Sequence, residues 1–479
     1  MHSNETDALC AVPVSLQRTS STNSASLLQN PVTTHGSTDF ISDNINSGTD
    51  VDQYHNAIGT SRTTGQIDHE AIFEFGGPIG ATLMMVLFPI LMIYLWICIE
   101  FYNGQLTTPD SWSDLFPFLY RMVEHVSYAA VPTWWAWSVY WTFTFFQVTL
   151  AVVMPGPVVK GLPVPSLDNQ QLDYLCNGIS CLYVTLLSSA VLHATDLFPL
   201  QLIVDRFGQL LSVSILSGFF VSIITYAVAI LRKKQHRMSG YFMYDFFMGA
   251  SLNPRLGSFD FKMFTEIRIP WVILFYISLS SLIKQIHILG YASPNMWFMV
   301  GFHADILEYG VPFTYCISSL YLLKTEAGRN LKFPVWAMVL LFVVLLLAYY
   351  VWDTANSQKN RFRMSMAGTY LPRYTFPQLP WGTLTNPTYI ITKRGSLLLT
   401  SGWWGMARKI HYTADLVMAI SWGLDTGFGS VIPYFYCMFF VIVLTHRVSR
   451  DMDRCGKKYG SDWEDYCREV PYIFIPFVV

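Results

Sequence analysis

Long apolar runs separated by short polar segments make up most of this chain after about residue 67. A helix needs roughly 20 apolar residues to cross about 30 Å of hydrocarbon. Runs of this length lie at about 78–102, 132–154, 175–198, 208–231, 270–291 and 333–352. Shorter or interrupted candidates lie at 309–323, 397–424 and 431–445. The pattern predicts an all-α fold, a polytopic transmembrane helical bundle of roughly 8 to 10 spans.

The first 67 residues have a different composition, rich in Ser, Thr, Asn, Asp and Gly with few large apolar residues. Such a segment cannot bury enough apolar surface to offset the entropy of ordering, so we expect it to be disordered. No charged stretch followed by an apolar core begins the chain, and we expect no cleaved signal peptide. The sequence therefore predicts a disordered cytosolic segment at 1–67 and a membrane domain at 68–479.

Basic residues between the spans indicate the orientation. They cluster at Arg232–Arg237, at Lys359–Arg363 and in a short basic C-terminal tail that begins at Arg447. The positive-inside rule places all three clusters, and with them both termini, in the cytosol. Three predicted spans separate the first two clusters, which is the wrong parity. Either residues 293–323 hold two short crossings or a re-entrant piece, or a span is reduced there.

Composition agrees with a membrane protein surrounded by lipid, since 52% of the residues are hydrophobic and 13% are charged. The net charge of −2 gives no global field for binding nucleic acid. The eight cysteines show no CxxC spacing, and His287 and His303 lack a third ligand at useful spacing. We expect neither a disulfide framework nor a metal site.

The tail from His446 to Tyr472 is the longest charge-dense stretch of the chain. Its cations alternate with Tyr459, Trp463 and Tyr466, whose rings offer flat stacking faces. A cytosolic basic flank with aromatic residues at the headgroup level would look similar. The tail alone is therefore compatible with a nucleotide site or with a simple membrane flank.

Four sequence blocks follow one another along the chain. They are GYFMYDFFMGASLNPR at 240–255, QKNRFR at 358–363, LLTSGWWGMARKIHY at 398–412 and the tail. Together they closely resemble the sterol reductase family, which includes the fungal C-14 and C-24(28) sterol reductases and the reductase-like domain of the lamin B receptor. The resemblance extends from about Phe73 to the end of the chain. ARKIHYTAD at 407–415, AxxQKNxFR at 355–363 and the YIFIPFVV terminus are most similar to the C-24(28) branch.

The resemblance implies a multi-pass reductase of the endoplasmic reticulum membrane with cytosolic termini. It would use NADPH to reduce the C-24(28) double bond of an ergosta-tetraenol type sterol in the last step of ergosterol biosynthesis, in association with other enzymes of that pathway. Two alternatives are a C-14 sterol reductase and a catalytically weak sterol-binding paralogue. The second is considered because the 293–323 region is shorter than its family equivalent.

The resemblance also assigns cofactor contacts, which fall in the part of the chain at about 355–479. Carried over by position, they are Lys359, Arg363, Leu399, Trp404, His411, Tyr412, Asp451, Cys455, Gly456, Lys457, Lys458, Tyr459 and Tyr466. The cations suit the phosphates of NADPH, and Trp404 and Tyr459 suit a ring. No GxGxxG follows a strand, which excludes a Rossmann site as the means of binding.

Reduction of an unactivated alkene by hydride requires a proton donor, because hydride attacks a carbocation and not an electron-rich double bond. The candidates near the cofactor blocks are Tyr412, Asp415 and His411. Those in the first block and the segment after it are Asp245, Tyr244 and Glu266. A tyrosine at a bundle interface is more often a packing residue, and Asp245 could instead pair with Arg255 or Arg268. The sequence does not separate these readings.

Three other classes of protein remain as rivals. A non-catalytic scaffold like the lamin B receptor would not need the cations and aromatic residues that this chain retains. A transporter would be expected to show inverted repeats. A methyltransferase of the isoprenylcysteine type shares a helical and basic C-terminal layout but would not be expected to carry the YDFFMG and LNPR block.

Overall fold

The computed structural model describes residues 73–164, 170–235, 238–251, 254–257, 259–305, 316–366, 368, 370 and 379–478. The predicted disordered segment, residues 1–67, lies outside the described residues, as do Leu252 and Asn253 of the LNPR motif. Helices dominate the described chain, and its strands form only two-stranded antiparallel sheets. The predicted all-α class is confirmed.

The N-terminal half contains α3 (Gly77–Phe101), η1 (Trp112–Asp114), α4 (Leu115–Ala129), α5 (Trp134–Val153), β1 (Val158–Val164), β2 (Gln170–Leu175), α6 (Gly178–Ala194), α7 (Leu202–Asp205), α8 (Phe207–Leu231), α9 (Phe242–Met248), β3 (Arg255–Leu256), β4 (Phe259–Asp260), α10 (Phe261–Met263), η3 (Phe264–Arg268) and α11 (Ile269–Leu289). The C-terminal half contains α12 (Pro294–Asp305), α14 (Ile317–Lys324), α15 (Glu326–Arg329), α16 (Val335–Met366), β5 (Tyr389–Ile391), β6 (Leu397–Leu399), α17 (Trp403–Met406), α18 (Ile410–Asp425), η4 (Ile432–Tyr434), α19 (Phe435–Tyr459) and α20 (Ser461–Glu469).

Six helices of the described chain are long and apolar enough to cross a membrane. They are Gly77–Phe101, Trp134–Val153, Phe207–Leu231, Phe261–Leu289, Val335–Met366 and Ile432–Tyr459. The chain is therefore a polytopic helical membrane protein. One predicted span, 175–198, is a shorter apolar helix of 17 residues. The predicted piece at 431–445 is the start of a helix that continues to Tyr459, deep into the polar tail.

Local sequence explains where the long helices begin and end. Pro occupies the first turn of α3 and of α11, where its missing N–H would have no helical partner. Gly290 ends α11 in the left-handed conformation, with φ of 77°. Thr133 caps α5 by accepting a hydrogen bond from the Ala136 amide.

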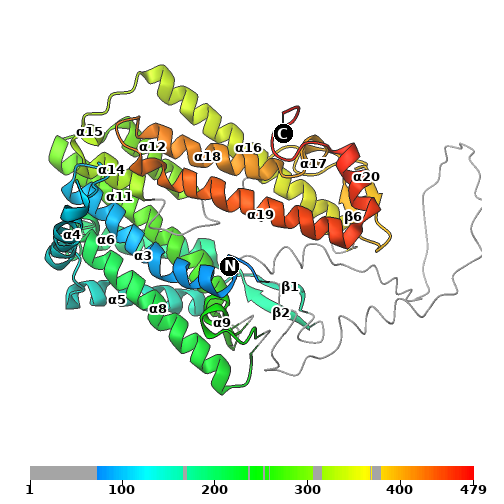
Figure 1. Cartoon of the computed structure of the whole chain (residues 1–479), viewed down its shortest axis with the longest axis horizontal. Coiled ribbons are helices and arrows are strands. Elements are labelled where there is room, and N and C mark those ends of the chain that lie inside the picture. The colour runs from blue at the N-terminus through cyan, green and yellow to red at the C-terminus, as the bar shows by residue number, and fades with distance from the viewer. Residues whose placement is uncertain are drawn as a thin grey trace, which may run out of the picture.

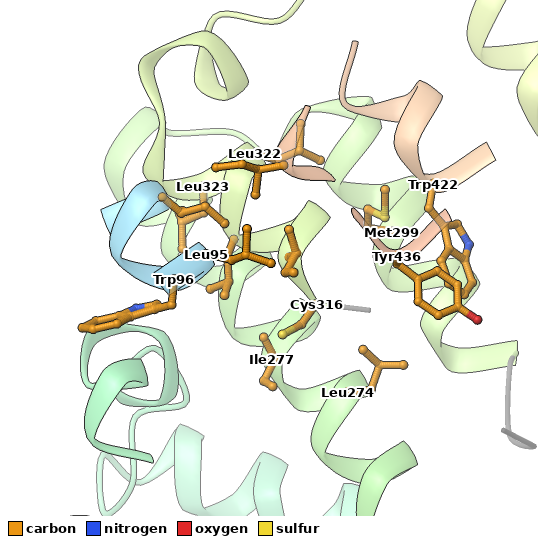
Figure 2. Packing of buried hydrophobic residues seen from close by; sticks show 14 of the residues in the cluster. Leu95, Trp96, Leu274, Ile277, Met299, Cys316, Leu322, Leu323, Trp422 and Tyr436 are labelled. Carbon is orange, nitrogen blue, oxygen red and sulfur yellow. The ribbon is translucent and has the colours of Figure 1, made fainter. Parts of the chain in front are cut away.

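A buried apolar cluster joins the two halves of the bundle (Figure 2). It brings together side chains from α3, α11, α14 and α18, among them Leu95, Ile277, Leu322 and Trp422. Large apolar side chains also cover the outside of the spans, including Leu87, Phe220 and Leu347. An apolar exterior is expected where a helix bundle meets lipid instead of water.

Residues 294–324 enter and leave the bundle at the same end. At the start of α12, the Asn295 amide donates to the Asp425 backbone oxygen (2.8 Å) and Oδ1 (2.9 Å) where α18 ends. At the end of α14, Lys324 lies 3.0 Å from Glu100 where α3 ends. The α3 and α18 ends adjoin each other, since the side chain of Gln105 donates to the Gly429 backbone oxygen. The α12–α14 pair thus begins and ends at one end of the bundle, and its connection at 306–315 lies outside the described residues.

This arrangement removes the parity conflict found in the sequence. Among the described helices between the first two basic clusters, only α11 and α16 are long enough to cross the bundle, and part of the predicted piece at 309–323 lies outside the described residues. Two crossings return the chain to the side from which it started. In Figure 1 the C-terminal ends of α8, α16 and α19 all lie toward the right of the view, as does the start of α3.

Candidate active site

The SGWW turn, residues 401–404, is held against the middle of α16 by three hydrogen bonds. The indole N–H of Trp403 donates to Thr354 Oγ1 and that of Trp404 donates to the Ala355 backbone oxygen, both at 2.8 Å. The Trp403 amide donates to Gln358 Oε1 at 3.0 Å. Gly402 has φ of 64°, and a Cβ there would collide with the Gln358 side chain. The turn therefore requires glycine and places both tryptophans in a defined orientation.

The fixed ring of Trp404 lies beneath a cation from α16. The Lys359 ammonium is 4.0 Å from the Trp404 ring centroid, within the range of a cation–π contact. Arg363 follows one turn later on the same helix. Leu399, at the end of β6, is buried in a small cluster with Phe362 and Trp404. These two cations and two apolar residues, all predicted from the sequence, meet at one place.

His411 and Tyr412 begin α18 beside this cluster. The His411 ring lies 5.0 Å from the Trp404 ring and 4.1 Å from the Tyr412 ring. Burial lowers the pKa of His411 well below its usual value, and Lys359, Lys409 and Arg447 lower it further. The imidazole is therefore neutral, and its buried Nδ1 has no hydrogen-bond partner among the described residues.

Tyr412 is buried, and its ring lies near two cationic side chains. Lys409 Nζ and the Arg447 guanidinium carbon are each 5.6 Å from the ring centroid. Burial raises the pKa of the phenol, more than Lys409 and Arg447 lower it. The hydroxyl thus keeps its proton at neutral pH and is able to act as a donor. Asp415 lies nearly one turn later on the same helix.

The last span, α19, contributes Asp451, which the sequence predicts as a contact of the cofactor. In the structure Lys409 Nζ donates to Asp451 Oδ2 at 2.7 Å. Arg447 and Asp451 are four residues apart on α19 and therefore share a face, which is turned toward the start of α18. Asp451 is an anion among several cations, so the site as a whole is electropositive.

The C-terminal residues close this region from outside. The amides of Arg408 and Lys409 donate to the backbone oxygens of Tyr472 (2.9 Å) and Ile473 (2.8 Å). Thr413 Oγ1 donates to the Phe474 oxygen at 2.6 Å. The end of the chain therefore runs along the α17–α18 connection and fixes the entry to α18.

The remaining predicted cofactor residues lie at the end of α19 and on α20. Cys455, Gly456 and Lys458 are partly buried, Tyr459 and Tyr466 are buried, and Lys457 is exposed. Burial raises the pKa of the Tyr466 hydroxyl well above its usual value. Asp462 of α20 accepts from the Lys393 amide, in the turn between β5 and β6, at 2.7 Å. This contact ties α20 to the hairpin that carries Leu399.

The first sequence block lies on α9, apart from the SGWW turn. The Asp245 carboxylate accepts from the Ser239 amide (2.8 Å) and hydroxyl (2.7 Å) and from the Gly240 amide (3.2 Å). The alternative pairing of Asp245 with Arg255 or Arg268 is wrong. Arg255 pairs instead with Asp260, and Arg268 donates to Asn177 and Cys181. Glu266 lies in η3, at the entry to α11.

Sequence reasoning missed three residues that shape the site: Gln358, Lys409 and Glu74. Gln358 and Lys409 belong to blocks that carried the resemblance, and only their side-chain contacts were not foreseen. Glu74 lies about 380 residues before its partners Arg450 and Arg454. No local spacing could have joined them.

The site fits a large phosphorylated cofactor better than a metal ion. Lys359, Lys409 and Arg447 offer positive charge beside aromatic faces, and the buried Nδ1 of His411, next to Trp404 and Tyr412, has no hydrogen-bond partner among the described residues. Within the described residues, no three His, Cys, Asp or Glu side chains are grouped so as to hold a metal ion.

Comparison with known proteins gives consistent matches along nearly the whole chain. The model of the Ergosterol biosynthesis ERG4/ERG24 family matches residues 69–308 and 298–479. The two pieces meet within the segment that the sequence predicts to be shortened. The Delta(24(24(1)))-sterol reductase erg4A of Aspergillus fumigatus is 43% identical over 442 residues, 85% of this chain and 93% of the relative.

Two further relatives show the range of the similarity. The Delta(24(24(1)))-sterol reductase of Gibberella zeae is 42% identical over 450 residues, 86% of this chain and 74% of the relative. The Delta(14)-sterol reductase of Dictyostelium discoideum is 33% identical over 439 residues, 85% of this chain and 92% of the relative.

Proposed function

The chain belongs to the ergosterol biosynthesis ERG4/ERG24 family, and from this premise we propose that it catalyses the last step of ergosterol biosynthesis. In that step the double bond between C-24 and its methylene carbon, numbered 24(28) or 24(24(1)), is reduced at the expense of NADPH. The substrate is a sterol of the ergosta-tetraenol type. The enzyme acts in the endoplasmic reticulum membrane with both termini in the cytosol, in association with other enzymes of the pathway.

The observation that carries this proposal is the graded similarity to the two kinds of sterol reductase. Relatives named for the Delta(24(24(1))) reaction are 42% and 43% identical to this chain. Relatives named for the Delta(14) reaction, the alternative, are 33% and 34% identical. Both comparisons extend over similar shares of this chain, so the difference in identity favours side-chain reduction.

The proposal gives each group of residues a role toward the cofactor. Lys359, Arg363, Lys457 and Lys458 would hold the phosphates through charge-assisted hydrogen bonds. Trp404 would present its ring, with Leu399 packed behind it, and Tyr459 would supply a second aromatic face. His411 would donate or accept one hydrogen bond through its free Nδ1, and Asp451, Cys455, Gly456 and Tyr466 would line the wall formed by the last two helices. When bound, NADPH supplies the hydride for the reduction.

Tyr412 is the best placed of the candidate proton donors. Its raised pKa keeps the hydroxyl protonated, and Lys409 and Arg447 beside its ring would stabilise the phenolate left after proton transfer. One alkene carbon takes this proton and the other takes the hydride, so the reaction adds two hydrogens to the double bond. Asp415 is the alternative donor on the same helix. Asp245 is held by three hydrogen-bond donors of the segment just before α9, which favours a structural role.

Sterol analysis in a cell is the direct test. A fungal strain that lacks its C-24(28) reductase would be complemented with this exact chain, and its sterols would be identified by mass spectrometry. We expect ergosterol to return and the C-24(28) unsaturated precursor to disappear. Rescue of a C-14 reductase mutant instead would establish the Delta(14) alternative. Failure to rescue either strain, with the protein present in the membrane, would favour a sterol-binding paralogue.

A further inference from the structure

Glu74, immediately before the first span, is a buried carboxylate with two arginine partners. Its side chain is 5% exposed and lies 2.7 Å from Arg450 Nη1, and it also accepts a hydrogen bond from Arg454. Both arginines belong to α19, the last span. A carboxylate with so little access to water depends strongly on its partners. Glu74 therefore joins the beginning of the membrane domain to its end.

Glu74 is itself held in place by α9. Its amide donates to the Tyr244 hydroxyl at 2.9 Å. On either side, the Phe73 ring lies 5.1 Å from Tyr244 and the Phe75 ring lies 5.5 Å from Phe247. These contacts also account for Tyr244 and Phe247 of the YDFFMG segment. Because its backbone and both neighbours are anchored, Glu74 presents a fixed acceptor to α19.

The face of α19 that contacts Glu74 adjoins the face that contacts the candidate active site. Arg450 and Arg454 are four residues apart and point to Glu74, whereas Arg447 and Asp451, also four apart, point to Tyr412 and Lys409. Residues three or four apart are neighbours on a helix surface. By holding Arg450 and Arg454, Glu74 thus sets the rotation of α19 about its axis. That rotation in turn sets the direction in which Arg447 and Asp451 point.

We propose that Glu74 is a positioning residue of the cofactor site, which acts through Arg454 and Asp451. While Arg454 is paired with Glu74, Asp451 is free to pair with Lys409. Without the Glu74 charge, Arg454 would turn to the next carboxylate within reach, and Asp451 lies three residues before it on the same helix. Lys409 would then lose its partner at the start of α18. This inference rests on the proposed cofactor site.

The test compares E74Q with the unchanged full-length enzyme in lipid nanodiscs. We expect the KM for NADPH to rise about five- to tenfold, the size of coupling found between contacting charged residues. The KM for the sterol should stay unchanged. In the double variant E74Q/R454Q the competing cation is absent, so the KM for NADPH should return most of the way to the original value. A residue needed only for folding would not show this recovery.

Glu100 offers a matched control, since it lies at the other end of α3 and also pairs with a cation, Lys324, at 3.0 Å. E100Q removes an ion pair with a single cation, at a carboxylate 27% exposed, and should leave the KM for NADPH unchanged. If E74Q does not fold, E74D replaces it, because the shorter carboxylate cannot hold both arginines and should give a smaller rise. An unchanged KM in the folded Glu74 variant would overturn the proposal.

The K359A variant shows whether a negative result concerns only the positioning role of Glu74 or the proposed cofactor site as a whole. If K359A raises the KM for NADPH and E74Q does not, the cofactor site stands and the positioning role is wrong. If neither variant changes that KM, the cofactor site itself is misplaced, and the role of Glu74 is refuted with it. Equal rises in E74Q and in E74Q/R454Q would refute the competition between Arg454 and Lys409 for Asp451.

Discussion

Lys409 and Asp451 form an ion pair across the interface between the start of α18 and the last span, with 2.7 Å between Nζ and Oδ2. Their side chains are only 16% and 12% exposed, so water screens the pair weakly. The pair connects the two segments that carry Tyr412 and Arg447. Asp451 thus has a structural partner in addition to the role toward the cofactor that we propose for it.

Replacement of Asp451 by Asn should lower turnover by more than tenfold, a loss of over ~1.4 kcal/mol of transition-state stabilisation. Because the amide keeps the shape of the side chain, the protein should still accumulate. The amide lacks the negative charge that holds Lys409. The measurement is sterol turnover per milligram of membrane-embedded enzyme. D453N changes an exposed acid on the same helix and serves as the control. Normal turnover of D451N at normal protein level would remove Asp451 from the site.

Lys359→Ala and Arg363→Ala should each weaken NADPH binding by about 1.5 to 3 kcal/mol, because each removes a hydrogen bond to a charged group. This corresponds to a rise in the KM for NADPH of roughly ten- to 150-fold. K393A is the matched control, since Lys393 is a cation at the same end of the bundle with a side chain 78% exposed. Equal KM values in all three variants would mean that Lys359 and Arg363 are only membrane flanks.

Tyr412→Phe should lower kcat by about 10² to 10⁴, the usual contribution of a general acid, with little effect on the KM for NADPH. The phenyl ring keeps the contacts with His411 and the two cations and lacks only the proton. D415N distinguishes the second candidate on α18. If D415N abolishes turnover while Y412F retains it, the assignment of the proton donor passes to Asp415.

His411 should make the protein less stable in mild acid. Its pKa is lowered in the folded state by burial and by nearby cations. As the pH falls through about 6.5, the unfolded chain takes up a proton there and the folded chain does not, so stability decreases. The drop in thermal midpoint between about pH 7.5 and pH 5.5 should be smaller in H411Q than in the unchanged protein. His446 is exposed, and H446Q should leave the drop as it is.

Gly402→Ala should disrupt the SGWW turn, whereas Gly395→Ala should be milder. Both glycines have positive φ, which costs any other residue roughly 1 kcal/mol or more. Only Gly402 also has the Gln358 side chain where a Cβ would go, while nothing lies near Gly395. The difference in thermal midpoint between the two variants isolates the effect of this contact. Equal destabilisation would show that Gln358 gives way without cost.

The sequence by itself determined the class of the protein and the place of its chemistry along the chain. Apolar runs must be helices in a membrane, because lipid offers the backbone no hydrogen-bond partners, and the structure confirms five of the six predicted long runs as possible spans. The blocks around Lys359, Trp404 and Tyr412 led to the family and to residues that lie together in the fold. Local spacing was enough to find each block, and the packing of the SGWW turn against α16 brings the blocks together.

Only the tertiary structure decided how distant segments complete the site. Polarity alone did not fix the path of the 293–323 region, and the contacts of Asn295 and Lys324 show that it begins and ends at one end of the bundle. The sequence also did not predict the ion-pair partners of Asp451 and Glu74, because an ion pair depends on which charged side chains face each other after the helices pack. Several cations near Asp451 in sequence were available to it, and the rotation of α19 selected Lys409 instead.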